Sequence, residues 1–368
     1  MKITFPYMGS TIIYQKLLEL LGYEVVMPPR PTQRTISLGV KYSPEFACFP
    51  YKVIMGSYIE ALEAGADTIV TSGGNGPCRA GFYSEVHLRT LRSLGYNVEM
   101  IVFDNFYREP LRFIRKILRL KGKNSWNHVA RVVSTTYRMA HAIDSLQKMV
   151  EYNRPYELER GSFTKVFDTI SRRFEVEVKT VADVRRLQEQ GLRMIEAIPV
   201  RKPPQNQRIR IGVVGEIYMV IESSINMGIA ELLNNLGCEV SRSMYISEWV
   251  DHVLPSFLGG RSEAAIAQKG ARYLEIPIGG HARNNIGNMV HYREQGFDGI
   301  VHLMPFACLP ELVTQSMAPV ISGDLGIPIL TLAIDEQTGT ANILTRLEAF
   351  IELVKNNKMN CAHARETA

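Results

Sequence analysis

The first third of the chain alternates short β-rich runs with amphipathic stretches of helical period, and this alternation is the strongest constraint on the fold. Three of the helical stretches stop at Gly22, Gly65 and Gly95, and a β-rich run follows each glycine. Glycine is common directly after a helix because it adopts the left-handed conformation without strain. Regular alternation of strand and helix favours a parallel sheet covered by helices. The expected strands are 2–7, 23–27, 67–71 and 97–103, and the expected helices are 11–21, 51–64 and 79–94.

Two short sequences occur twice in the same order, which indicates a duplicated lobe. Residues 21–25 (LGYEV) recur as 236–240 (LGCEV), and residues 65–70 (GADTIV) recur as 296–301 (GFDGIV). β-rich runs return at 209–214, 239–243, 299–304 and 327–334. The sequence therefore predicts an α/β protein with two similar Rossmann- or flavodoxin-like lobes, each built on a parallel sheet.

The part of the chain between the two β-rich regions has a different character. Residues 110–198 show long helical periodicity with many Arg and Glu, and Pro203 and Pro204 then mark a linker. We therefore expect four parts, in chain order: an N-terminal α/β lobe (1–109), a helical connecting segment (110–206), a C-terminal α/β lobe (207–358) and a tail (359–368).

Composition excludes several classes of protein. Apolar residues make up 46% and charged residues 21% of the chain, values of a globular protein with a full core. The net charge of +5 is mild, and the basic run at residues 112–123 has no interleaved aromatic residues, so we expect a solvated helix face or an acidic partner and no nucleic acid. No apolar run approaches the roughly 18 residues of a membrane span, and the N-terminus is no signal peptide, so we expect a cytoplasmic protein.

Three of the five cysteines share one local pattern. Cys48 lies in FACFP and Cys308 in FACLP, so each comes just before a proline that suits the first turn of a helix. Cys78 follows a glycine-rich turn and also precedes a helix. A helix N-terminus favours negative charge and lowers the pKa of a thiol. Thiolates bind soft metals and iron–sulfur clusters, so these three residues are candidate metal ligands.

Other interpretations of the cysteines remain open at this point. A lone cysteine is most often a small buried apolar residue, which is the expected role of Cys238, and Cys361 lies in a polar tail. Structural zinc generally uses four ligands in closely spaced pairs, whereas these cysteines are widely separated. The position of the second lobe that matches Cys48 falls near Gly279, Gly280 and His281 and has no thiol. A cluster held by three thiolates would leave one iron open to solvent or substrate.

The cysteine motifs resemble those of 2-hydroxyacyl-CoA dehydratase subunits. The resemblance rests on residues 46–50, 76–83 and 305–311, on the ending at 335–350, and on residues 215–218 with Asn226. It extends over most of both lobes and is greatest toward the small stand-alone proteins grouped with CoA-enzyme activases. Benzoyl-CoA reductase subunits and a double-cubane reductase are relatives of the same family. Two fused cubanes need six protein thiolates, more than the five cysteines present.

The resemblance implies one 4Fe-4S cluster per chain, bound by Cys48, Cys78 and Cys308 between the two lobes. Family members accept an electron from an ATP-hydrolysing activase that carries its own cluster, and then form a ketyl radical from a 2-hydroxyacyl-CoA and expel water. A lyase of this type, or a low-potential reductase, would work anaerobically on a CoA ester as a homodimer or with a paired homologous subunit. The alternatives are an electron-relay or accessory subunit without its own substrate, and a zinc-binding or metal-free α/β protein.

The remaining candidate features carry weaker signals. Residues 72–76 (SGGNG) lack the Gly-Lys-Ser/Thr of a phosphate loop, so we expect no nucleotide bound by this chain itself. Glu216 follows the first strand of the second lobe and is a candidate catalytic proton carrier or a helix N-cap. His281 is the second catalytic candidate, with a solvated or core histidine as the alternative.

Overall fold

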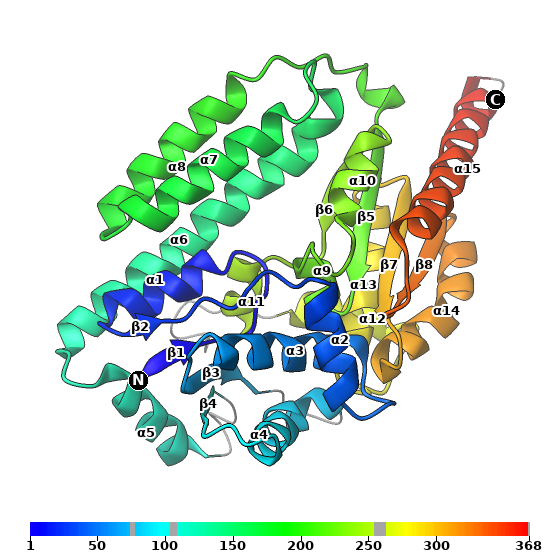
Figure 1. Cartoon of the computed structure of the whole chain (residues 1–368). Coiled ribbons are helices and arrows are strands. Elements are labelled where there is room, and N and C mark those ends of the chain that lie inside the picture. Colours follow the sequence, from blue (N-terminus) through cyan, green and yellow to red (C-terminus); the bar gives the residue numbers. More distant parts are fainter. Residues whose placement is uncertain (74–77, 104–108, 254–262, 367–368) are drawn as a thin grey trace. The chain divides into compact units, whose positions relative to one another are not determined.

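The structure is a computed structural model that describes residues 1–73, 78–103, 109–253 and 263–366 (Figure 1). The chain divides into two compact units, each of which is described here by itself. The first unit contains residues 1–143 and 170–189, and the second contains residues 144–169 and 190–368. Each unit holds a four-stranded, all-parallel sheet, so the predicted α/β class with two Rossmann- or flavodoxin-like lobes is confirmed.

The sheet of the first unit has the strand order β2-β1-β3-β4. Its strands are β1 (Lys2–Thr4), β2 (Glu24–Val25), β3 (Thr68–Ser72) and β4 (Glu99–Phe103). The helices that accompany it are α1 (Ile12–Leu20), α2 (Gln33–Tyr42), α3 (Phe49–Glu63), α4 (Tyr83–Ser93) and α5 (Pro110–Lys121). Ile3 on β1 and Ile101 on β4 pack with Leu18 of α1 and Leu120 of α5, so these two helices close one part of the core.

The sheet of the second unit has the same topology, with the order β6-β5-β7-β8. Its strands are β5 (Ile209–Gly215), β6 (Cys238–Arg242), β7 (Gly299–Pro305) and β8 (Ile329–Ile334). Its helices are α9 (Ile217–Ile221), α10 (Ile229–Asn235), α11 (Ile246–Val253), α12 (Ala264–Ala271), α13 (Ala282–Glu294), α14 (Leu309–Leu325) and α15 (Thr340–Glu366).

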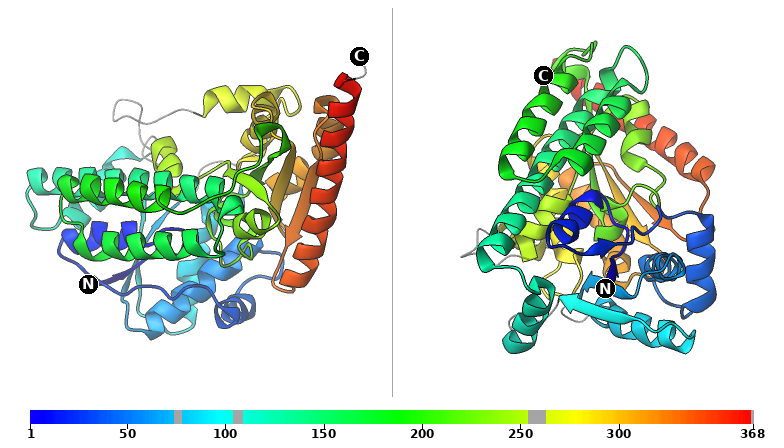
Figure 2. Two further views of the ribbon diagram at one scale, coloured as in Figure 1. Left: turned by 90° about the horizontal axis from the view of Figure 1, so that it is seen from above. Right: turned by 60° about the vertical axis from the view of Figure 1, so that its left-hand side comes forward.

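Glycines on two strands of the second sheet let helices lie close to it. The Tyr292 ring of α13 fills the space beside Gly212, and Phe350 and Val354 of α15 fill the space beside Gly299. Ile211 also borders the space beside Gly299, so Ile211 and α15 lie on one face of the sheet. Gly212 is the next residue on β5 and faces the other way, so α13 covers the opposite face. Figure 2 shows α15, in red, running along this sheet.

Long helices make up most of the segment that lies between β4 and β5 in the sequence. They are α6 (Trp126–Asn153), α7 (Ser162–Glu177) and α8 (Val181–Glu196), and the boundary between the two units falls within all three. In the first unit, Arg186 of α8 forms an ion pair with Glu177 of α7 at 2.9 Å. None of the described helices combines the length and the apolar character that a membrane crossing requires.

The same pair of hydrogen bonds occurs once in each unit, in addition to the same strand order. The backbone N–H of Lys2, where β1 begins, donates to the Asp67 carboxylate at 2.9 Å, and the N–H of Arg210, near the start of β5, donates to the Asp298 carboxylate at 2.8 Å. Each aspartate N–H returns a bond to the carbonyl of the same partner. Both aspartates belong to the repeated GxD sequence, so the repeat marks equivalent joints.

A close helix crossing recurs in the two units. A Cβ on Gly56 of α3 would lie 1.9 Å from the Thr35 carbonyl of α2, and a Cβ on Gly287 of α13 would lie 1.9 Å from the Ile266 carbonyl of α12. The partner glycines, Gly39 and Gly270, face the opposite helix just as closely, at 1.9 and 2.0 Å. The differences 287 minus 56 and 270 minus 39 are both 231, so α2 and α3 correspond to α12 and α13.

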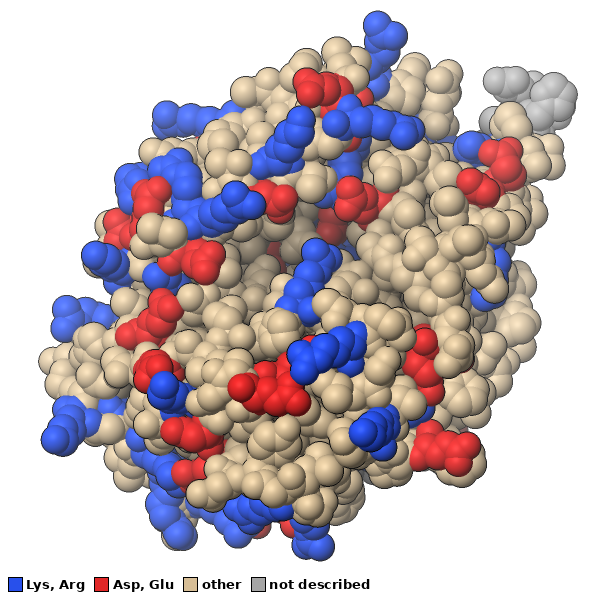
Figure 3. All heavy atoms as spheres, in the orientation of Figure 1, with Lys and Arg blue, Asp and Glu red and all other residues tan. Residues whose placement is uncertain are grey.

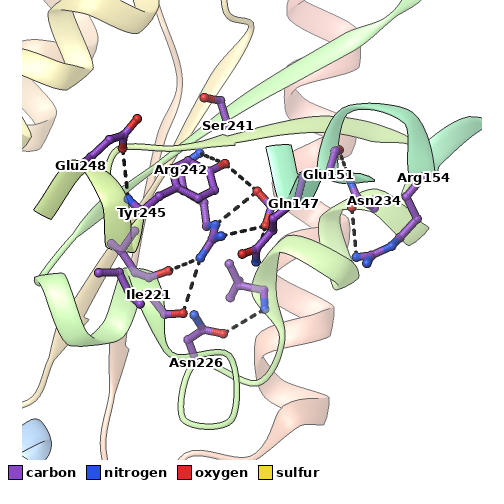
Figure 4. A network of polar contacts seen from close by, with 12 residues as sticks. Gln147, Glu151, Arg154, Ile221, Asn226, Asn234, Ser241, Arg242, Tyr245 and Glu248 are labelled. Atoms are coloured by element: carbon purple, nitrogen blue, oxygen red, sulfur yellow. Dashed lines mark hydrogen bonds and ion pairs between the residues drawn. The ribbon is translucent and has the colours of Figure 1, made fainter. Parts of the chain in front are cut away.

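A buried ion-pair network joins α6 to the second sheet (Figure 4). Arg242, at the end of β6, forms an ion pair with Glu151 of α6 at 3.0 Å, and the Tyr245 hydroxyl donates to the same carboxylate at 2.7 Å. The guanidinium also donates to the Val220 carbonyl at 3.1 Å, in the last turn of α9. The guanidinium thus provides a hydrogen-bond donor for a carbonyl in the last turn of α9, and its positive charge is favourable at that end of the helix.

The glycine crossing predicts opposite effects for two Gly→Ala substitutions in helices. Gly56→Ala places a methyl group against the Thr35 carbonyl and should cost about 1–3 kcal/mol of stability. Gly323→Ala in α14 is the matched control, because nothing lies within 4 Å of its Cβ position, and it should gain about 0.5–1 kcal/mol. Urea unfolding of both variants checks this, and equal stability of the two would contradict the close crossing.

Candidate functional site

Cys48 and Cys308 occupy the same kind of position, the N-cap of a long helix. Cys48 precedes α3 and Cys308 precedes α14, both with extended backbone and both with proline in the first helical turn. The two side chains are buried, at 6% and 8% exposure. The expectation that each cysteine comes directly before a helix is confirmed. Backbone N–H groups at such a terminus favour a negatively charged sulfur.

Cys78 also precedes a helical turn, although the element after it differs from the expected one. It caps a 3-10 turn (Arg79–Phe82), and α4 begins only at Tyr83, whereas a single helix over 79–94 was expected. Most of the glycine-rich turn before it, residues 74–77, lies outside the described residues. Cys78 is partly exposed, unlike the other two cysteines.

Two contacts join the segments that carry Cys48 and Cys78. The Arg79 guanidinium donates to the Phe46 carbonyl at 2.9 Å, and the Tyr83 hydroxyl forms a hydrogen bond with the Cys48 sulfur. The first unit therefore holds two of the candidate ligands on adjacent segments. Tyr83 lies five residues after Cys78, at the end of the motif 76–83, and no role was expected for it.

The turn before Cys308 is backbone-strained. Ala307 has a φ of 62°, a left-handed conformation that costs a non-glycine residue roughly 1 kcal/mol. The Cys308 N–H bonds the Pro305 carbonyl at 3.1 Å, and the Phe306 N–H bonds Ile334 of β8 at 2.8 Å. Strain of this kind persists only where the surroundings determine the conformation. The Cys308 backbone is thus fixed from both sides.

The described residues do not by themselves assemble a metal centre. No group of three or more His, Cys, Asp and Glu side chains among them is placed to hold a metal ion, so the three-cysteine ligand set remains a prediction. Cys238 is the first residue of β6 and is fully buried, and burial raises the pKa of its thiol to about 12. It is a core thiol, as expected. The side chain of Cys361 lies outside the described residues.

Glu216 is the N-cap of α9, one of the two roles expected for it. Its carboxylate accepts a hydrogen bond from the Met219 N–H at 3.0 Å. The pKa of this carboxyl is raised to about 7, chiefly by burial; the backbone N–H groups of Met219 and Tyr218 oppose the shift, and the Glu311 charge adds a smaller rise. A carboxyl group with this pKa can hold or release a proton near neutral pH.

Glu311 belongs to a buried polar network that the sequence did not reveal. Its carboxylate lies 2.8 Å from His302 Nε2 on β7 and accepts from the Asn285 amide of α13 at 2.9 Å. The same amide donates to the Gly215 carbonyl at 3.0 Å, one residue before Glu216. Glu311 and His302 are 1% and 0% exposed. The available signals were a glutamate one helical turn after Cys308 and a histidine inside a buried strand.

His281 is the N-cap of α13, and the glycines before it lie near α14. Adding the offset of 231 to Cys48 gives Gly279, so the counterpart of this cysteine falls within the expected segment 279–281. Gly279 and Gly280 have φ values of 87° and 59°. A Cβ on Gly280 would lie 2.7 Å from Pro310, two residues after Cys308. Only a glycine permits this approach.

The charged surface is mixed in sign. On the face shown in Figure 3, Lys and Arg side chains are interspersed with Asp and Glu side chains. Within the basic run on α5, Arg112 forms an ion pair with Glu109 at 2.9 Å, and Arg119 forms one with Glu99 of β4. Part of the positive charge of this helix is therefore balanced locally.

One comparison with known proteins gives a match. Residues 3–71 match the family model described as CoA enzyme activase uncharacterised domain. The matched segment runs from β1 into β3 and contains Cys48, α2 and the crossing with α3. A search of curated proteins finds no match. The match links the N-terminal part of the chain to proteins associated with CoA-enzyme activases.

The raised pKa of Glu216 predicts a pH-dependent stability. The folded-state pKa of about 7 lies above the ordinary value of 4.5, so between these values the folded protein binds more protons than the unfolded chain, and stability falls as pH rises. Glu216→Gln should remove this part of the fall between about pH 4.5 and pH 7. Urea unfolding across that window measures it, and parallel profiles for wild type and variant would refute the assignment.

Proposed function

We propose that this chain is an iron–sulfur protein of the 2-hydroxyacyl-CoA dehydratase type, with one 4Fe-4S cluster bound by Cys48, Cys78 and Cys308. In this proposal it accepts an electron from an ATP-hydrolysing activase and acts on a CoA ester. The observation that carries the proposal is the shared position of the three cysteines, each the N-cap of a helical segment.

The donor chemistry of these residues fits an iron–sulfur cluster. Iron–sulfur clusters require thiolate ligands, and Cys48 and Cys308 each lie at the N-terminus of a long helix, an end that favours negative charge. Cys238 supplies an internal contrast, because it lies within a strand and burial raises the pKa of its thiol to about 12. Its sulfur stays protonated at neutral pH, so the proposal assigns it no role as a ligand.

The cluster would supply low-potential one-electron chemistry when bound. The chain's own residues would hold and move protons. Glu216, with a pKa near neutrality, can accept or donate a proton, and the Glu311 charge makes a small contribution to this raised pKa. The Asn285 amide holds the Glu311 carboxylate and the β5 terminus in one arrangement. Gly280 lets the turn before α13 lie against Pro310, in the first turn of the helix that Cys308 precedes.

The proposed partner follows from the family match and the resemblance of the cysteine motifs. The model that matches residues 3–71 is named for CoA enzyme activases. An external electron donor is consistent with a chain in which the sequence shows no nucleotide-binding motif. We therefore assign ATP hydrolysis to a separate activase and electron acceptance to this chain.

The ligand assignment predicts iron content directly. Anaerobically purified Cys48→Ala, Cys78→Ala and Cys308→Ala variants should each lose most of the iron and sulfide, because a cubane bound by two thiolates is poorly held. Cys238→Ala is the control and should retain the wild-type content. Metal and sulfide analysis of the four variants measures this, and equal loading of all four would end the cluster assignment.

The electron source predicts a dependence on a second protein. Where no chemical reductant is added to the chain itself, its reduction should require an activase together with ATP, and the protein purified alone should show no ATP turnover. Electron paramagnetic resonance of the reduced protein reports the electron, and a CoA ester should alter the spectrum. A spectrum that no CoA ester changes would favour the electron-relay function, and ATP turnover by the protein alone would contradict the partner assignment.

A further inference from the structure

The Tyr83 hydroxyl lies against the Cys48 sulfur, and the two residues come from different segments of the first unit. Tyr83 is the first residue of α4, whereas Cys48 caps α3. The hydrogen bond between them spans 35 residues of sequence, so it is a tertiary contact. The second contact between these segments, from Arg79 to the Phe46 carbonyl, holds the same two stretches of backbone together.

A cluster of aromatic rings positions the Tyr83 side chain. The Tyr51 ring of α3 packs edge-on against it, with a centroid distance of 4.9 Å, and stacks on the His87 ring at 4.0 Å. His87 Nε2 bonds the Tyr51 carbonyl at 3.1 Å, and the Tyr58 ring closes the cluster at 5.4 Å from His87. These contacts restrain the direction of the hydroxyl.

His87, Tyr51 and Tyr58, the other rings of the aromatic cluster, are all uncharged near neutral pH. His87 is 1% exposed, and burial lowers the pKa of its imidazole to about 4, so the ring is neutral. Burial raises the pKa of Tyr51 to about 12 and moves the pKa of Tyr58 well above its ordinary value. The rings therefore form a neutral and constant support for Tyr83.

A phenol beside a metal-bound thiolate can act only as the hydrogen-bond donor, because the thiolate has no proton. Hydrogen bonds to the ligand sulfurs are one of the factors that set the reduction potential of an iron–sulfur cluster. The donor stabilises the additional negative charge of the reduced state, and so raises the potential. Groups that act on a ligand in this way are positioning residues that tune the metal centre.

We propose that Tyr83 donates a hydrogen bond to the Cys48 sulfur and thereby raises the reduction potential of the iron–sulfur centre. This inference rests on the proposed function, which it deepens by naming a residue that sets the potential of the electron acceptor. Tyr83 binds no metal and touches no substrate in this role.

The first experiment is a redox titration of anaerobically purified protein, followed by electron paramagnetic resonance. Tyr83→Phe keeps the ring and removes the donor, so the midpoint potential should fall, by up to about 59 mV if the equilibrium constant for reduction changes about tenfold. Tyr51→Phe keeps the support of the Tyr83 ring and should leave the potential unchanged. Iron and sulfide content should be the same in all three proteins. An unchanged potential in Tyr83→Phe overturns the proposal.

A second experiment reads the hydrogen bond without iron. In cluster-free, reduced protein, the infrared S–H stretching band of Cys48 is assigned by its loss in Cys48→Ala. Tyr83→Phe should shift this band, or make it appear, whereas Tyr51→Phe should not. An unchanged band in Tyr83→Phe also overturns the proposal. Absence of iron from the wild type would instead overturn the proposed function, and with it the redox role, even where the band shifts.

Discussion

The close crossing of two helices at glycine is the constraint on which each lobe depends. A backbone carbonyl of one helix lies where the Cβ of the other would be, once at Gly56 and once at Gly287. At such a separation the two helices can neither rotate nor slide without a clash. The crossing therefore fixes the start of α3, where Cys48 lies, and the start of α13, where His281 lies. For α13 the sheet adds a second constraint, because the Tyr292 ring fills the space beside Gly212 of β5.

The sequence predicted the sheets well because strands and glycine-terminated helices leave strong local patterns. All eight described strands fall within or overlap the expected β-rich runs. It did not predict α2, whose buried positions include Thr35 and Gly39. Its closest contacts run through the backbone at Thr35 and Gly39, and its larger apolar residues Ile36 and Leu38 are only half-buried, so no run of fully buried apolar residues marks it. The equal spacing of the glycine pairs was the available sign of this helix pair.

The candidate site was predictable only where its geometry is local. Proline in the first helical turn restricts the residue before it, so the N-cap positions of Cys48 and Cys308 could be expected. The contact of Tyr83 with Cys48 and that of Asn285 with Glu311 join residues 35 and 26 positions apart. Such contacts depend on how helices and strands assemble, and a single sequence records no trace of them.

The strained turn before Cys308 has a consequence for binding. Its backbone is tied to β8 through Phe306, to Pro305 through its own N–H, and to α14 through the Leu312 N–H. A loop that becomes ordered on binding pays a conformational entropy of roughly 1–2 kcal/mol for each residue fixed. This turn has already incurred that cost during folding. The backbone that carries Cys308 is therefore preformed, so the proposed binding of a cluster by this residue would not have to order the turn.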